Sequence, residues 1–451
     1  MKTHTFKGGI HPDEFKEMSN KCPITDVFPS TKTVTIPVTM GGAPNTPVVQ
    51  VGDSVKRGQL IAKNDAFMSA PVHSSISGKV KKIQSCLVTG NLEVPCITIE
   101  ADDLNETDFM PPLDPFACSK EDALKRIKDA GIVGMGGASF PAHVKLNPPA
   151  DKKIDYVLLN AAECEPYLTV DERTLQENPD KIIDGLKIVC HILGGCPALI
   201  VLENNKEYIV PELNKAIQNA GAQKQIAVSL VKTKYPQGCE KNIVDAVLKV
   251  HVPAGKLPAD AGAVICNVGT VCAISDAFRL GMPLIDRALT ISGGAVEKPC
   301  NIRVPVGTLV GDLIPDVFKL KEGQTAKIVS GGPMMGFAMT NAQFPIAKGT
   351  SGVTFLTKNE TYLVDESQCI SCGKCINACP MNLSPVLMVR EIKAEHLEKA
   401  KKFGLMDCIE CGCCSYMCPA NVRLVQHFRL GKMQVRALMA LEKAKAAGGA
   451  K

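Results

Sequence analysis

Apolar and polar segments alternate regularly through the middle of the 451-residue chain. Short apolar runs predict buried strands at residues 156–160, 198–202 and 226–232. Segments with helical spacing of apolar residues predict helices at residues 121–130, 179–193, 208–220 and 239–250. Strands that alternate with helices are typical of layered α/β folds. We therefore expect an α/β domain over residues 119–286.

Two further regions have strand-like patterns. In residues 1–105, Val51-Gly-Asp-Ser-Val and the later Ala70-Pro71 segment resemble the barrel-sandwich fold of lipoyl and biotinyl carriers. The tip between them, residues 65–71, contains no lysine, so we expect the fold without a swinging arm. An acidic, proline-containing linker follows at 102–118. Residues 287–356 predict a small β-grasp-like module, with strand-like segments at 288–294, 302–305, 307–314 and 326–332. Within it, Met334 and Met335 are interpreted as core or interface packing.

The C-terminal part of the chain predicts a cluster domain at 360–425 and a basic tail at 426–451. An amphipathic helix is expected at 385–402, between two similar halves. Residues 422–451 carry seven Lys and Arg against one Glu, within a chain of net charge +5. This tail is mostly helical by pattern. It is either a solvated helix or a surface for acidic lipid or a membrane-embedded partner. Its basic residues are Arg423, Arg429, Lys432, Arg436, Lys443, Lys445 and Lys451.

Composition narrows the possible partners. No apolar run reaches the roughly 20 residues that span a bilayer, so we expect a soluble or peripheral protein. Aromatic residues make up 4% of the chain and Trp is absent, which argues against a stacking platform for nucleic acid.

Eight of the twenty cysteines carry the clearest chemical signal. They form two runs with the spacing C-x₂-C-x₂-C-x₃-C-P, which is typical of two-cluster bacterial ferredoxins. In this pattern three cysteines of a run hold one [4Fe–4S] cluster, and the fourth binds the other cluster. Each fourth cysteine is expected to begin a helix, with the following proline in its first turn. The predicted ligands are Cys369, Cys372, Cys375 and Cys418 for one cluster, and Cys379, Cys408, Cys411 and Cys414 for the other.

Alternative uses of these cysteines are weaker. A structural zinc site needs one or two CxxC pairs. It does not require the third cysteine and the final proline that both runs contain. Disulfides need an oxidising compartment, whereas we expect no secretory signal in this protein. The other twelve cysteines are scattered, as expected for reduced thiols in a cytosolic protein. Cys413 lies outside the ligand register.

A second site is indicated at the start of the α/β domain. Gly131-Ile-Val-Gly-Met-Gly-Gly follows a predicted helix, so it does not match the dinucleotide fingerprint that follows a strand. The segment Asn160-Ala-Ala-Glu-Cys-Glu165 comes directly after an apolar strand, where α/β proteins usually bind ligands. Lys234–Glu240 and Cys266–Thr270 follow later strands.

These four blocks resemble the flavin-binding core of the flavoprotein subunit of respiratory complex I. The order of domains over nearly the whole chain resembles the C subunits of Rnf complexes, which are ion-translocating ferredoxin:NAD⁺ oxidoreductases. The resemblance implies a barrel-sandwich domain, an FMN-binding α/β domain, a β-grasp-like module and a ferredoxin-like domain with two [4Fe–4S] clusters. Met135, Ser139 and Ala162 depart from the complex I pattern, which has Arg, Gly and Asp there.

The resemblance also implies a set of binding residues. Phe140 and Glu165 are expected on the NAD(H) side. Non-covalent FMN is expected near Gly134, Gly136, Gly137, Lys145, Asn160, Glu163, Tyr235, Gly238, Glu240, Asn267 and Thr270.

By resemblance, the expected function is electron transfer between ferredoxin and NAD⁺, coupled by membrane partners to ion pumping. FMN would exchange hydride with NAD(H), and the two clusters would relay single electrons to or from the other Rnf subunits. The chain would be peripheral, on the cytoplasmic side of the cell membrane. Two alternatives remain open: a soluble NADH-dependent reductase of the cobalamin-reductase kind, and a non-catalytic cluster scaffold.

Overall fold

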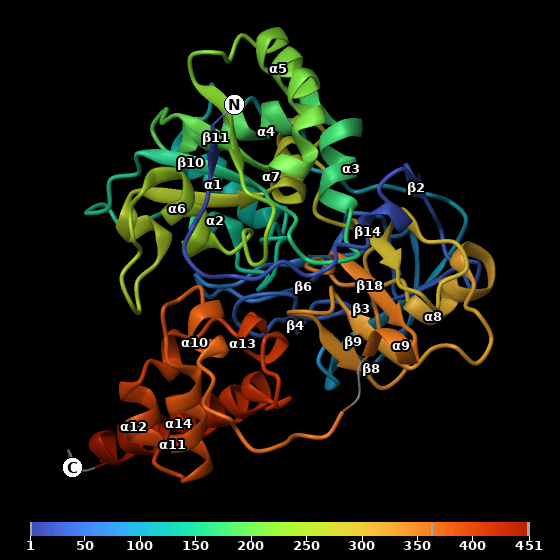
Figure 1. The fold of residues 1–451 in the computed structure, drawn as a ribbon. Coiled ribbons are helices and arrows are strands. Elements are labelled where there is room, and N and C mark those ends of the chain that lie inside the picture. The colour runs from blue at the N-terminus through green and yellow to red at the C-terminus, as the bar shows by residue number, and fades with distance from the viewer. Residues whose placement is uncertain (1, 362–363, 449–451) are drawn as a thin grey trace.

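A parallel five-stranded sheet lies at the centre of the predicted α/β domain (Figure 1). The computed structural model describes residues 2–361 and 364–448. The strand order is β1-β12-β11-β10-β13. The strands are β1 (Thr3–His4), β10 (Tyr156–Ala161), β11 (Ala198–Glu203), β12 (Ile226–Val231) and β13 (Ala263–Asn267). The strand predictions for this region are confirmed, and the first residues of the chain add an edge strand that the sequence did not indicate.

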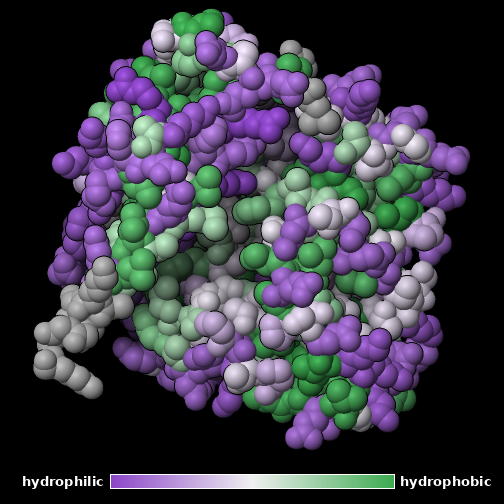
Figure 2. Space-filling view, turned by 90° about the horizontal axis from the view of Figure 1, so that it is seen from below, coloured by the Kyte–Doolittle hydropathy of each residue, from purple (hydrophilic) through white to green (hydrophobic). Residues whose placement is uncertain are grey.

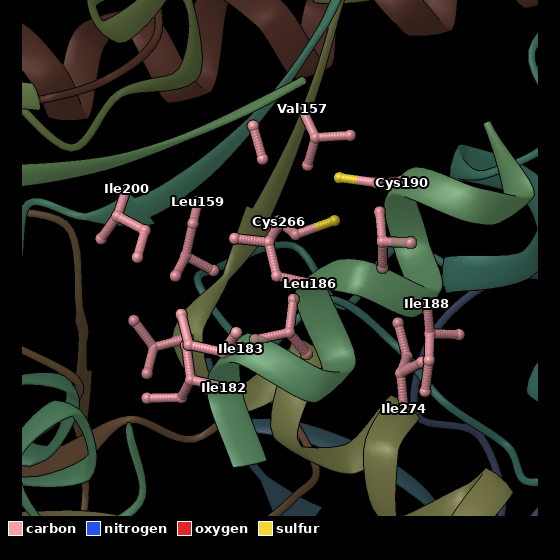
Figure 3. Packing of buried hydrophobic residues seen from close by; sticks show 14 of the residues in the cluster. Val157, Leu159, Ile182, Ile183, Leu186, Ile188, Cys190, Ile200, Cys266 and Ile274 are labelled. Carbon is pink, nitrogen blue, oxygen red and sulfur yellow. The ribbon is translucent and has the colours of Figure 1, made fainter. Parts of the chain in front are cut away.

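Helices cover both faces of this sheet, as the α/β prediction requires. Alternate residues of β10 divide between the faces, so Val157 and Leu159 pack with α4 and α7 while Leu158 packs with α6. Figure 3 shows Ile182, Ile183 and Leu186 of α4 pointing toward the strands. The helices are α1 (Lys120–Asp129), α2 (Ala142–Lys145), α3 (Val170–Glu177), α4 (Pro179–Ile192), α5 (Val210–Asn219), α6 (Glu240–Leu248) and α7 (Val268–Arg279).

The barrel-sandwich region consists of two small sheets around one core. Their strand orders are β3-β9-β8-β5 and β4-β6-β7. Val34, Ile36, Ile61 and Ile97 are fully buried between them. The strands are β3 (Thr33–Pro37), β4 (Thr46–Pro47), β5 (Ser54–Val55), β6 (Leu60–Lys63), β7 (Val72–His73), β8 (Gly78–Val88) and β9 (Leu92–Ala101).

A mixed sheet forms the β-grasp-like module, in the order β17-β16-β18-β14-β15-β2. β14 pairs in parallel with β18 and antiparallel with β15. The predicted strand-like segment at 307–314 is wrong in part, because Val310–Leu313 forms helix α8. Val310 and Leu313 are both buried, and one helical turn places residues three apart on the same face. The strands are β2 (Ile24–Asp26), β14 (Asp286–Ser292), β15 (Cys300–Pro305), β16 (Lys327–Ser330), β17 (Phe337–Met339) and β18 (Gly352–Leu356).

The C-terminal region is helical and follows α9 (Lys358–Thr361). The single helix predicted at 385–402 is wrong, because Glu395 has φ 58° and separates two helices. Helix α14 crosses the expected boundary at 425/426, and its residues Phe428 and Val435 belong to the core of the cluster domain. The helices are α10 (Lys374–Ala378), α11 (Pro385–Lys393), α12 (Leu397–Lys402), α13 (Cys413–Tyr416) and α14 (Leu424–Gly448).

The basic residues of α14 are not all available to a partner. Arg429 and Lys432 both pair with Glu410, at 3.0 and 2.8 Å, and Lys432 is buried. Lys443, Lys445 and Lys451 lie outside the residues whose side chains the structure describes.

Two further observations concern possible contacts with a membrane or a partner. Within residues 2–361 and 364–448 no helix combines the length and apolar character needed to cross a membrane. The face seen from below is hollowed, and hydrophobic residues line part of the hollow (Figure 2).

Candidate cofactor sites

A cavity of about 110 Å³ opens at the carboxyl end of the parallel sheet. Ten of the thirteen residues expected to bind FMN or NAD(H) line this cavity: Gly134, Gly136, Gly137, Phe140, Lys145, Asn160, Gly238, Glu240, Asn267 and Thr270.

The glycine-rich loop after α1 forms one wall of this cavity. The Gly134 N–H donates to the Phe140 carbonyl at 2.8 Å, which closes the loop. The Met135 N–H donates to Oγ1 of Thr270 at 3.0 Å and ties the loop to α7. A side chain at Gly136 would stand 3.3 Å from Cβ of Asn267, so glycine keeps this approach open. The loop can therefore present its backbone closely to a bound group.

The N-terminus of α7 forms the neighbouring wall, in contact with the glycine loop. Asn267 caps this helix, with its Oδ1 accepting from the Gly269 N–H at 2.9 Å. Its Nδ2 donates to Asp171 at 2.7 Å, which fixes the amide. The N-terminus of a twelve-residue helix carries partial positive charge and suits a phosphate.

Lys145 supplies the full positive charge on the cavity wall. Its Nζ lies 2.5 Å from Oε1 of Glu240 and donates to the Ile265 carbonyl at 3.0 Å. On the other side of the cavity, Asn160 Nδ2 donates to the Gly238 carbonyl at 2.8 Å. A glycine loop, a helix N-terminus and a lysine together are a donor set that fits the phosphate and polar edge of FMN.

Three predicted residues do not line the cavity. Glu163 accepts hydrogen bonds from the backbone N–H groups of Asp171 and Glu172, so it holds the first turn of α3. Glu165 accepts from the N–H groups of Met334 and Met335 in the β-grasp module. Tyr235 is buried and its hydroxyl donates to the Cys411 carbonyl. In the structure, each of these three side chains therefore holds two parts of the chain together.

Arg287 holds the glycine loop through its backbone, and no local pattern in the sequence indicated this role. Its guanidinium donates to the Met135 carbonyl at 3.2 Å and to the Thr350 carbonyl at 2.6 Å. Burial lowers the pKa of Arg287 to about 10, against the attraction of Asp171 and Glu163. Burial and the nearby Glu163 raise the pKa of Asp171 to about 7, while Arg287 opposes that rise.

Apolar residues complete the cavity, and sequence reasoning missed them. They are Ala142, Leu146, Ile265, Cys266 and Ile274. Ile274 could have been found, because it lies four residues after Thr270 and so shares its face of α7. A mixed polar and apolar lining of this kind suits a planar ring system with a charged tail.

The four cysteines predicted for the second cluster line one small cavity. They are Cys379, Cys408, Cys411 and Cys414. Leu383, Met388, Val425 and Phe428 form its apolar wall. Backbone N–H groups already face two of the sulfurs, from Leu383 to Cys379 and from Glu410 to Cys408, each at 3.4 Å. An apolar cavity with four thiols and sulfur-directed N–H groups fits a [4Fe–4S] cluster.

The other four predicted ligands lie nearer the surface. Cys369 and Cys372 are exposed, whereas Cys375 and Cys418 pack against the core of the domain. The Ser367 N–H donates to the Ala420 carbonyl at 2.9 Å, which ties the segment before Cys369 to the segment after Cys418. The two ends of this ligand set are therefore held together.

The two cysteine runs adopt the same backbone course. Ser371 and Gly373 in the first run, and Glu410 and Gly412 in the second, all have positive φ between 54° and 85°. Contrary to expectation, Cys379 and Cys418 follow the short helices α10 and α13 and do not begin the next ones, and Pro380 and Pro419 lie in turns.

Burial affects the thiols of the enclosed set. It raises the pKa of Cys408 to about 11 and also raises those of Cys379 and Cys414. Iron binding must therefore displace protons from these thiols. In the described part of the chain, no three His, Cys, Asp or Glu side chains are grouped so as to hold a single metal ion.

A small hydrophobic cluster joins the two sites. It contains Ile10, Tyr235, Ala378, Cys411 and Cys413, with Cys164 and Met334 packed against it. Tyr235 lies three residues before Gly238 of the flavin cavity, and Cys411 lines the enclosed cysteine cavity. Helices α10 and α13 lie at the end of the cluster domain that faces the rest of the molecule (Figure 1).

Comparison with known proteins agrees with this architecture. Residues 127–276 match the Nuo51 FMN-binding domain, residues 4–104 match the RnfC barrel sandwich hybrid domain, and residues 361–419 match the 4Fe-4S dicluster domain. The C subunit of the proton-translocating ferredoxin:NAD(+) oxidoreductase complex of Clostridium ljungdahlii is 47% identical over 445 residues, covering 98% of this chain and 96% of the relative. The chain belongs to the family of C subunits of ion-translocating ferredoxin:NAD(+) oxidoreductases.

Other members of this family are also similar over nearly the whole chain. The C subunit of the Na(+)-translocating complex of Acetobacterium woodii is 40% identical, covering 96% of this chain and 98% of the relative. The C subunit of the ion-translocating oxidoreductase complex of Rhodobacter capsulatus is 38% identical, covering 96% of this chain and 83% of the relative. The predicted family, the four-part fold and the FMN and [4Fe–4S] cofactors are thereby confirmed.

A solved structure shows a similar fold at low sequence identity. It is an NAD⁺-reducing [NiFe]-hydrogenase in the H₂-reduced state, with a TM-score of 0.50 and 19% identity. The match covers 70% of this chain and 63% of the hydrogenase chain.

Proposed function

We propose that this chain is the NAD(H)-reacting subunit of a membrane-associated, ion-translocating ferredoxin:NAD⁺ oxidoreductase. The observation that carries the proposal is one continuous arrangement within a single chain. Tyr235, three residues before Gly238 of the glycine-loop cavity, donates to Cys411 of the enclosed four-cysteine cavity, and the other cysteine set includes the exposed Cys369 and Cys372.

The residues around the flavin cavity have distinct parts in this proposal. The Gly134–Gly137 backbone and the α7 N-terminus would bind the FMN phosphate, while Lys145, Asn160 and Glu240 would hold polar groups of the cofactor. When bound, FMN supplies the hydride chemistry that converts two-electron into single-electron transfer. Gly136, Gly137 and Ala138 are exposed, so the loop leaves the cavity open on the side proposed for NAD(H). Phe140 lines the cavity and offers a ring on which NAD(H) could stack.

The two cysteine sets would act in sequence. The set of Cys379, Cys408, Cys411 and Cys414 lies against the flavin domain, because Tyr235 contacts Cys411 directly. The set of Cys369, Cys372, Cys375 and Cys418 includes two exposed cysteines. Electrons that pass between NAD(H) and a partner would thus cross the enclosed cluster on the flavin side and the surface cluster on the partner side.

We further propose the partners and the location of the chain. The related complexes are named as ferredoxin:NAD(+) oxidoreductases that translocate ions, and this chain is similar to their C subunits. Ferredoxin-like and membrane-embedded subunits of the same complex would be its partners, on the cytoplasmic side of the membrane. Isolation from membranes together with several further subunits would support this placement. A chain that stays entirely in the soluble fraction of its native cells would instead support the soluble reductase.

The electron-transfer proposal is tested by anaerobic absorbance spectroscopy of the purified chain. We expect about eight irons, which is two cubane clusters, and one released FMN per chain. NADH should bleach both the flavin and the cluster bands. Clusters without bound flavin, or a flavin that NADH does not bleach, would contradict the hydride chemistry and support the scaffold alternative.

A matched pair of lysine variants tests the flavin cavity itself. Lys145→Met removes a charge that lies on the cavity wall, and Lys153→Met removes one from the exposed Lys153–Asp155 pair outside it. Loss of a charge-assisted hydrogen bond costs about 1.5–3 kcal/mol, so FMN affinity should fall roughly 10- to 100-fold in Lys145→Met. Lys153→Met should bind FMN as the unmodified chain does. Equal affinity in both variants would place FMN elsewhere.

A further inference from the structure

The hairpin between β16 and β17 has a tip that reaches from the β-grasp module to the cluster domain. Ser330 pairs with Phe337, so residues 331–336 form the tip. The Gly336 N–H donates to the Gly332 carbonyl at 2.9 Å, and Gly331 has φ 99°. These contacts give the tip a defined shape, because the turn is closed by its own backbone.

Glu165 of the flavin domain clamps this tip. Its carboxylate accepts from the Met335 N–H at 2.8 Å and from the Met334 N–H at 3.2 Å. A side chain at Gly332 would stand too close to Oε2 of Glu165, so only glycine allows the carboxylate this position. The Glu165 carbonyl in turn accepts from Lys16 Nζ at 3.1 Å. The position of the tip is therefore set by the flavin domain.

Met334 covers the loop that carries the enclosed cysteines. A Cβ at Gly412 would lie 3.3 Å from Cε and 3.3 Å from the carbonyl oxygen of Met334. Met334 also packs against the cluster that includes Cys411 and Cys413. Its neighbour Met335 is 43% exposed. One of two adjacent methionines thus packs on the second cysteine run, and the other is exposed.

The exposure of this loop to water affects the midpoint potential of a cluster bound there. Four thiolates make such a cluster anionic, and reduction adds a further negative charge. Water stabilises the more highly charged reduced form, and cluster potentials depend on solvent exposure and on hydrogen bonds to sulfur. A residue that excludes water from the Gly412 side would therefore keep the midpoint potential low.

We propose that the 331–336 tip is a solvent shield for the cluster held by Cys379, Cys408, Cys411 and Cys414. In this proposal, Met334 is a positioning residue that excludes water beside Gly412, and Glu165 is the clamp that seats it. The flavin domain thereby sets the potential of the cluster nearest to it. The proposal rests on the cluster ligands assigned above and adds a role for a hairpin that the proposed function does not use.

The test compares Met334→Ala with Met335→Ala in the full chain with its clusters. An anaerobic redox titration followed by electron paramagnetic resonance reports the midpoint potential of each cluster. We expect Met334→Ala to shift one cluster to a more positive potential and to leave the other unchanged as an internal reference. Met335→Ala should leave both potentials unchanged, because its side chain is exposed and Met334 is the methionine that packs against Cys411 and Cys413. Equal potentials in the two variants and the unmodified chain would overturn the shield.

Two further variants keep the test decisive. Glu165→Ala frees the tip without changing Met334 and should shift the same cluster in the same direction. Met334→Leu keeps most of the side-chain volume and should stay near the unmodified potential, even where the alanine variant fails to assemble. A leucine variant that shifts as far as Glu165→Ala would also count against the shield. Absence of clusters from the unmodified chain would instead overturn the proposed function, so the two failures are distinguishable.

Discussion

The phenol oxygen of Tyr235 donates a hydrogen bond of 2.8 Å to the carbonyl oxygen of Cys411. This contact connects the α/β domain with the cluster domain at the point where the two cofactor sites approach each other. Tyr235 is 1% exposed, so its hydroxyl is shielded from water. The same residue pair bears on stability and on electron transfer.

Tyr235→Phe removes this hydrogen bond while keeping the ring. We expect a loss of about 1 kcal/mol in the free energy of unfolding, because a net buried hydrogen bond contributes about 0.5–1.5 kcal/mol. We also expect slower reduction of the clusters by NADH, since the two domains lose a fixed contact. Denaturant titration and stopped-flow absorbance measure these effects. A variant with lowered stability and an unchanged reduction rate would show that the contact serves stability alone.

Substitution of single ligands separates the two clusters. Cys379→Ala and Cys369→Ala should each lower the iron content from about eight to about four per chain. In Cys369→Ala the remaining enclosed cluster should still be reduced by NADH. In Cys379→Ala the remaining surface cluster should not be, because the enclosed cluster lies between it and the flavin domain. The opposite pattern of reduction would reverse the order of the clusters.

The ion pair of Lys206 and Glu203 gives a stability prediction away from the cofactors. Both side chains are 1% exposed and their charged atoms lie 3.0 Å apart. Lys206→Met leaves Glu203 buried without its partner, which should cost about 3–5 kcal/mol in the free energy of unfolding. Lys153→Met, which breaks an exposed pair, should change it by less than about 1 kcal/mol. Comparable losses in both variants by thermal or denaturant unfolding would contradict the prediction.

The buried Lys348 should make the free energy of unfolding depend on pH above neutrality. Its Nζ is buried and donates to the carbonyls of Pro71 and Gly131, at 2.9 and 2.8 Å. Burial lowers the pKa of Lys348 to about 7, from an ordinary value of 10.5. Between these values the unfolded chain binds the extra proton. The stability contributed by this group is therefore complete above 10.5 and is lost as the pH falls toward 7.

The Lys348 contribution to the stability curve should have a slope of up to about 1.4 kcal/mol per pH unit in that window. Lys348→Met should remove this slope. The nearby His73 does not interfere, because burial and Lys348 lower its pKa to about 3, which places its titration in acid. Urea unfolding at a series of pH values from about 7 to about 10 checks the prediction. An unchanged slope in Lys348→Met would assign the dependence to other groups.

The sequence predicted best what local spacing determines. The eight cluster cysteines lie within two short runs, so their pattern is visible without knowledge of the fold. The strands β10 and β11 were found because each is a mostly apolar run buried on both faces, whereas β12 includes Ser229 and an exposed Ala227. The helix predicted at 385–402 was wrong at residues 394–396, where the left-handed conformation of Glu395 has no reliable local signal.

Contacts between distant segments were beyond the sequence pattern. Arg287 belongs to the first strand of the β-grasp module, yet it holds Met135 of the glycine loop 152 residues earlier. Glu165 was expected on the nicotinamide side from its motif, and its carboxylate instead binds the Met334 and Met335 N–H groups. A motif predicts where a residue lies along the chain and on which element. The partner of that side chain depends on which other domain packs against it.

The pairing of the first residues also has a consequence for synthesis. β1 pairs in parallel with β12, and β2 pairs in parallel with β15. On the ribosome, residues 3–4 have no partner until residue 231 has emerged, and residues 24–26 wait for residue 303. Contacts of such long sequence separation form slowly. The beginning of this chain is therefore among the last parts to take its place, and a tag or truncation there would act on two sheets that are made much later.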